Sequence, residues 1–81
     1  MYKYHIKFIA PKARRWMFLT PKGGGTYLRI HASMFEEQHL ERCFDIVKDI
    51  EESNEGYHAK VVLIDDGSEV KASKKTREHV A

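Results

Sequence analysis

The chain has 81 residues, enough for one domain built from one sheet and one helix and too few for a second domain. Hydrophobic residues make up 42% of the sequence, which excludes an intrinsically disordered chain, and a single cysteine excludes an intramolecular disulfide. The net charge of +2 is too small to name a partner, but residues 1–31 carry +7 and residues 32–56 carry −6.

The first two strands are predicted from the pattern of apolar residues. In residues 2–9, large apolar side chains alternate with lysine and histidine, which is the period of two expected of a strand with one buried face. Pro11 ends this strand because proline has no amide donor for a sheet. Residues 16–20 form a largely apolar run, which is typical of an inner strand.

A glycine-rich turn and a third strand follow. Residues 21–25 end in three glycines, which reach positive φ without steric cost and so predict a connector. Residues 26–31 alternate again, and we expect Leu28 and Ile30 to face the core. The three strands are expected to form a meander.

A single amphipathic helix is predicted after the meander. Ser33 and Glu36 have the spacing of a capping box, so we expect the helix to begin here. Its apolar positions recur at steps of three and four residues: Leu40, Cys43, Phe44, Val47 and Ile50. Gly56 can adopt the left-handed conformation of a helix cap, so the helix is expected to stop near residue 53 after roughly 20 residues.

Two further segments are predicted after the helix. Residues 58–65 are β-branched and apolar on both faces, which predicts an interior strand that runs parallel to one strand of the meander. Residues 65–67 have the composition of a tight turn, after which residues 68–72 would add a short edge strand. Residues 73–81 are mostly charged or small and are expected to form a mobile tail.

The predicted fold class is therefore α+β. A single, mostly antiparallel sheet in the order β-β-β-α-β, with a fifth short strand at its end, would carry one helix on one face. Residues 1–72 would form the only domain. The other face of the sheet, named the open face below, is left to water or to a partner. An open sheet also has free edges, so a dimer through an edge strand is a further expectation.

No pattern for catalysis or metal binding is found, so we expect no enzyme, no cofactor and no metal site. The glycine run precedes a strand and lacks the Gly-Lys-Ser/Thr order of a phosphate loop. Cys43 follows His39 by four residues, but a cysteine on the apolar stripe of a helix is expected to be buried and unreactive. The five histidines show none of the spacings of a zinc motif.

The open face is predicted to be basic and to carry aromatic side chains. Strand alternation and the adjoining loop assign to it Lys3, His5, Lys7, Arg14, Arg15, Tyr27, Arg29 and His31, with Trp16 beside them. Basic residues neutralise phosphates and aromatic rings stack on bases, as binding of single-stranded nucleic acid requires. The alternative is that these residues only solvate the wet face of a half-buried sheet.

The predicted helix has an acidic outer face formed by Glu37, Glu41 and Asp45. Carboxylates at steps of four repel each other by roughly a few tenths of a kcal/mol, so helix stability alone does not favour this stripe. It would suit a basic partner. The alternative is an ordinary solvated helix surface.

The segment 15–23, followed by residues 28–32 and the capped helix, resembles small proteins of phages and prophages. The likeness covers roughly residues 4–64 and rests on pattern and turn chemistry. Compact phage accessory proteins often bind a host protein or nucleoprotein and block it, as anti-restriction and anti-CRISPR proteins do. The resemblance implies a non-catalytic binding protein that modulates or inhibits such a host partner.

Two functions thus remain open, namely binding of a host protein or nucleoprotein and binding of nucleic acid by the open face. Polar residues interrupt every apolar run, so neither a signal peptide, a spanning helix nor a membrane partner is expected. The single cysteine favours a reducing compartment, and we expect a cytoplasmic protein.

Overall fold

The alternating segment at the start of the chain forms β1 (Tyr2–Ile9), the longest strand and the centre of the sheet. The computed structural model describes residues 1–71. Along one side β1 pairs with β5 (His58–Leu63), and along the other it pairs with β2 (Met17–Leu19) and β4 (Phe35–Glu36). A strand paired on both sides over most of its length holds the two halves of the sheet together.

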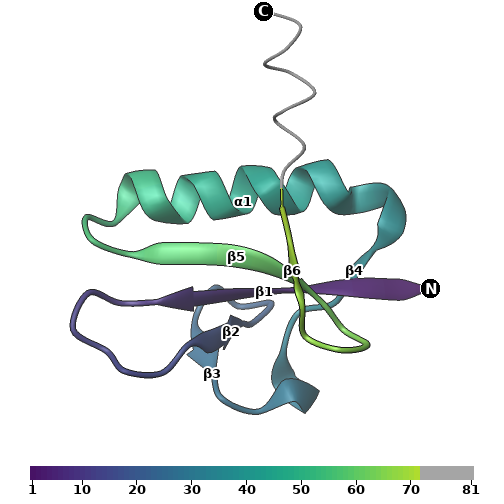
Figure 1. The fold of residues 1–81 in the computed structure, drawn as a ribbon, viewed down its shortest axis with the longest axis horizontal. Helices are drawn as coiled ribbons and strands as arrows, with labels where there is room; N and C mark the ends of the chain where they lie inside the picture. Colours follow the sequence, from purple (N-terminus) through teal and green to yellow (C-terminus); the bar gives the residue numbers. More distant parts are fainter. Residues whose placement is uncertain (72–81) are drawn as a thin grey trace, which may run out of the picture.

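Two short strands complete the sheet at its edges. β3 (Gly25–Thr26) pairs with β2, and β6 (Glu69–Val70) pairs with β5, so the order is β3-β2-β1-β5-β6 and every pairing is antiparallel (Figure 1). The expected α+β class with one helix on one face is confirmed. The expected edge strand also forms as β6, after a turn in which Gly67 has a φ of 75°.

The predicted direction of β5, parallel to one strand of the meander, is confirmed for β2, but β5 pairs with β1 and not with β2. β5 lies antiparallel to β1 and runs in the same direction as β2, with β1 between them. The chain enters the helix beside Tyr2, where β4 pairs with β1, and returns to the sheet opposite Ile9. A strand that begins beside the last residue of β1 and pairs along β1 has to run in the opposite direction.

The helix α1 (Leu40–Ser53) begins later than the capping box predicted and has 14 residues. The segment that the box would have capped is extended at β4 and then forms the 3₁₀ turn η2 (Glu37–His39). Ser33 serves tertiary contacts instead, because its amide donates to the Leu19 carbonyl at 2.8 Å. Pairing with β1 therefore overrides the local helix signal. The predicted end of the helix is confirmed, and Gly56 has a φ of 83°.

The third strand is also shorter than predicted. Only Gly25 and Thr26 pair with β2, and the chain then bends into the 3₁₀ turn η1 (Arg29–His31), which lies at the bottom of the view in Figure 1, far from α1. The predicted core positions Leu28 and Ile30 are 57% and 84% exposed. The alternation of apolar residues predicts a strand here, but the chain leaves the sheet after Thr26, before it reaches Leu28 and Ile30.

The main core lies between α1 and the sheet. Its buried members are Tyr4, Ile6, Cys43 and Val61. Partly buried side chains surround them: Leu19, Phe35, Leu40, Phe44, Ile46, Val47, Ile50, Leu63 and Val70. The apolar stripe predicted for the helix is confirmed by this cluster. No helix within residues 1–71 is long and apolar enough to cross a membrane. The predicted tail, residues 73–81, lies outside the described residues.

Candidate binding surfaces

Half of the face opposite α1 is covered, which the sequence did not predict. His5 and Val62 are paired across β1 and β5 on this face, yet they are only 4% and 1% exposed. The His5 Nδ1 lies 3.0 Å from the Ser33 carbonyl oxygen, in the connection between β3 and β4. The connection therefore folds back over the sheet at His5, and the expectation that His5 lies on a wet surface is wrong.

A cluster of two lysines and two aromatic rings occupies the other half of the same face. We name Lys7, Lys60, Trp16 and Phe18 the cation–aromatic cluster. The Lys7 Nζ lies 4.9 Å from the centre of the Phe18 ring, and the Lys60 Nζ lies 4.2 Å from that of Trp16. All four side chains are half-buried, and such contacts contribute about 0.5–1 kcal/mol each at exposed sites and about 2 kcal/mol when desolvated. The edge of the His5 ring also meets Phe18, with 5.1 Å between the ring centres.

The two lysines of this cluster face each other directly. Lys7 and Lys60 are opposite partners in the antiparallel pair of β1 and β5. Like charges at opposite positions destabilise a sheet, and within residues 1–71 neither ammonium has a carboxylate within 4.0 Å. Among the described residues, the two lysines therefore form no ion pair, although Asp65 and Asp66 line the same pocket as Lys7.

The expected basic surface is less uniform than the sequence suggested, because two of its members are engaged elsewhere. Lys3 forms an ion pair with Glu37, with 3.6 Å between Nζ and Oε2. Arg29 lies over the open face and reaches the end of β5, where its Nη2 donates to the Ile64 carbonyl at 2.6 Å. A shallow pocket below Arg29 is lined by both basic and acidic side chains: His5, Lys7, Arg29, Asp65 and Asp66.

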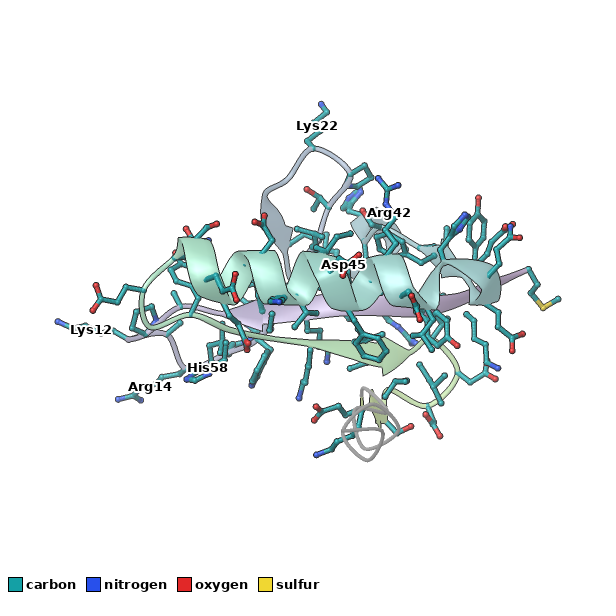
Figure 2. All side chains as sticks on the ribbon, turned by 90° about the horizontal axis from the view of Figure 1, so that it is seen from above. Lys12, Arg14, Lys22, Arg42, Asp45 and His58 are labelled. Atoms are coloured by element: carbon teal, nitrogen blue, oxygen red, sulfur yellow. The ribbon has the colours of Figure 1, made fainter. Side chains whose placement is uncertain are left out.

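The remaining predicted basic residues lie around the sheet. Arg14 projects from the β1–β2 loop at the same end of the molecule as Lys12 and His58 (Figure 2). The guanidinium carbon of Arg15 lies 4.0 Å from the centre of the Tyr27 ring, next to β3. His31 is exposed on η1. Of the predicted basic set, only Lys7 belongs to the cation–aromatic cluster, together with Trp16, which was predicted beside that set.

The predicted acidic stripe is divided between two elements. Glu37 lies in η2 and is paired with Lys3, so it does not belong to α1. Glu41 and Asp45 are exposed on α1, and Arg42, three residues before Asp45 on the same helix, is exposed as well (Figure 2). The outer surface of the helix therefore carries both signs of charge.

Exposed apolar side chains gather on the connection that leads from β3 to β4. We name Leu28, Ile30 and Met34 of this connection, together with Tyr2, which lies beside Met34, the apolar connection surface; the exposed fractions of Leu28, Ile30, Met34 and Tyr2 are 57%, 84%, 50% and 54%. Tyr2 and Met34 line one shallow depression together with Pro21, Ala32 and Phe35. Single exposed apolar residues are common on proteins, but a group on one short connection is typical of a surface that contacts another protein.

The thiol of Cys43 and the metal-binding types of side chain were the sequence features closest to reactive chemistry. Cys43 lies on the inner side of α1 and is fully buried, and this burial raises the pKa of its thiol to about 11. The positive charge of Arg42 lowers the same pKa by a smaller amount. The thiolate that a nucleophile requires is therefore disfavoured at neutral pH. Within the described part of the chain, no three His, Cys, Asp or Glu side chains lie close enough together to hold a metal ion.

Two features of these surfaces were missed in the sequence. The apolar run of residues 61–64 predicts a strand that is apolar on both faces and hides Lys60, although His58, Lys60 and Val62 occupy one face by alternation. The exposure of Leu28 and Ile30 has no comparable signal, since it depends on where the chain leaves the sheet.

The sequence matches no family model, no curated protein and no solved structure at a significant level. The likeness to phage and prophage accessory proteins therefore stays a prediction.

Proposed function

We propose that the chain is a small non-catalytic binding protein that docks onto a protein partner through its apolar connection surface. The exposure of Ile30, 84% of its surface on a turn far from the main core, is the observation that carries this proposal. Covering a side chain of this size contributes about 1.5–3 kcal/mol, so a partner that covers Leu28 and Ile30 gains a large part of a typical affinity.

The connection is also held in place, as an interface needs. The Ser33 amide donates to the Leu19 carbonyl, and the Ser33 carbonyl oxygen lies within hydrogen-bond distance of His5. Arg29 adds a third anchor at Ile64. A surface held before binding loses less conformational entropy when a partner covers it. A partner of the kind implied by the phage likeness, a host protein or nucleoprotein, fits this arrangement.

The test is affinity capture with a double variant, Leu28→Ser with Ile30→Ser. The immobilised protein is incubated with nuclease-treated lysate of the source cells, and bound proteins are identified by mass spectrometry. We expect at least one protein that the wild type retains and the double variant does not. Affinity for that purified protein should then fall by about tenfold or more in the double variant.

Lys48→Glu is the matched control, because Lys48 is exposed on α1. This control should bind the partner like the wild type. The proposal is wrong if no captured protein distinguishes the double variant from the wild type. It is also wrong if sedimentation shows that the surface is covered by a second copy of the same chain.

A further inference from the structure

We infer that the less covered half of the open face binds single-stranded nucleic acid, with the cation–aromatic cluster, whose four side chains are half-buried, as its centre. The site goes beyond the proposed protein contact and uses different residues. Its four members come from two parts of the chain, since Lys7, Trp16 and Phe18 lie in or next to β1 and β2, whereas Lys60 lies in β5. Only the antiparallel pairing of β1 with β5 brings the two lysines together.

The chemistry of the cluster matches the two parts of a nucleotide. Lys7 and Lys60 supply two positive charges without a carboxylate within 4.0 Å among residues 1–71, and phosphates of a strand would neutralise them. Trp16 and Phe18 supply ring faces on which bases can stack. Each ammonium lies within 5 Å of a ring centre, so a base on the ring would place its phosphate near an ammonium.

The contacts between the lysines and the rings do not block such binding. In half-buried pairs such as these, a cation over a ring and a base on that ring are contacts of similar strength, but the nucleotide also brings a phosphate that the ammonium can neutralise. The flexible lysine side chain can therefore move from the ring to a phosphate as the base takes its place. The same movement relieves the repulsion between Lys7 and Lys60.

The charges around the cluster favour one path for a bound nucleic-acid strand. Towards the β5–β6 turn, Asp65 and Asp66 line the pocket and would repel a phosphate chain. Towards the opposite end of β5 lie His58, Arg14 and Lys12, which Figure 2 shows together at one end of the molecule. A bound strand is therefore expected to run from the cluster towards Arg14 and away from Asp66.

Tryptophan fluorescence and anisotropy test this inference directly, because Trp16 is the only tryptophan of the chain. The probes are a labelled thymidine oligonucleotide of roughly 12 nucleotides, its uridine counterpart, and an abasic strand of equal length, all at about 50 mM salt. We expect both base-bearing strands to bind and to quench Trp16, and the abasic strand to bind more weakly with little quenching. The ratio of the DNA and RNA affinities identifies the preferred sugar.

Two variants with the same change of charge distinguish binding at the cation–aromatic cluster from nonspecific electrostatic attraction of the oligonucleotide to the protein. Lys60→Glu removes a cluster lysine and places a carboxylate opposite Lys7, which keeps the sheet pairing favourable, whereas Lys48→Glu changes a lysine on α1. We expect Lys60→Glu to lower affinity by about tenfold or more and Lys48→Glu to change it by less than about twofold. No binding at low salt, an equal loss in both variants, or binding without quenching of Trp16 would each overturn the inference. Leu28→Ser with Ile30→Ser should leave oligonucleotide binding unchanged, so this site and the protein contact can fail separately.

Discussion

His5 shows how a single contact changes what a residue can do. Its place between two lysines on β1 suggested an exposed basic side chain, and its position on the face opposite α1 agrees with that alternation. The hydrogen-bond contact with Ser33, 28 residues along the chain, buries the ring under the connection instead. A neighbour so distant in sequence leaves no trace in the local pattern.

Cys43 gives a prediction for stability at high pH. Its thiol has an ordinary pKa of 9.0 when the chain unfolds, and burial raises the pKa to about 11 in the folded protein. Between these pH values the unfolded state loses a proton that the folded state keeps, so the free energy of unfolding should fall as pH rises. Urea unfolding at a series of pH values measures this dependence.

Cys43→Ala is the control for this measurement. The variant loses side-chain volume in the core and should be less stable at pH 7. Its further loss of stability between pH 9 and pH 11 should nevertheless be smaller than that of the wild type, because the buried thiol is gone. Parallel pH dependences in the two proteins would contradict the proposed effect of burial.

At the scale of elements, the two turns on either side of β5 rely on glycine for different reasons. Gly56 and Gly67 both have positive φ, at 83° and 75°. A side chain at Gly56 would also meet Pro11, with only 2.9 Å between its Cβ and the proline Cγ, whereas nothing lies within 4 Å of one at Gly67. The turn after α1 therefore packs against the loop that follows β1.

Alanine at each glycine separates the two effects. We expect Gly67→Ala to lower the free energy of unfolding by about 1 kcal/mol, because it adds only the cost of positive φ. Gly56→Ala should cost roughly 1–2 kcal/mol more, because Pro11 also has to move. Denaturant unfolding with an unchanged slope measures both values. Equal decreases in the free energy of unfolding would mean that the close approach of Pro11 does not destabilise Gly56→Ala further.

At the scale of the whole molecule, the sheet offers little free edge for pairing with another copy. Its outermost strands, β3 and β6, have two residues each. β6 pairs with Val61 and Val62 of β5 and does not cover residues 58–60. In this uncovered part, the Ala59 amide donates to Glu51 Oε2 of α1 at 3.0 Å, so it is not free to pair with another strand. The expected dimer through an edge strand stays untested, but a blocked amide is a common protection against such pairing.

Removal of the Glu51 carboxylate should open this edge. In Glu51→Ala the Ala59 amide loses its acceptor, so its hydrogen exchange measured by NMR should become faster. The Leu63 amide donates to the Ser68 carbonyl at 2.9 Å and serves as the internal control, with an unchanged rate. Glu51→Gln keeps an acceptor oxygen, so the exchange rate of the Ala59 amide in this variant should lie between the rates in the wild type and in Glu51→Ala. An unchanged rate at Ala59 in the alanine variant would show that Glu51 does not protect the edge.

The sequence by itself determined the parts of this protein that depend on neighbouring residues. Alternation located β1, the steps of three and four residues located the buried stripe of α1, and Gly56 and Gly67 marked two turns. These features are readable because periodicity and backbone freedom act within a few residues of the chain.

Only the tertiary structure decided which surfaces are available for binding. The pairing of β1 with β5 brings Lys60 opposite Lys7, and the fold of the connection buries His5 while it exposes Ile30. Ser33 begins no helix because its backbone joins contacts with β1 and β2. Each of these outcomes depends on contacts between residues far apart in the sequence, whose energies outweigh local preferences of about 1 kcal/mol.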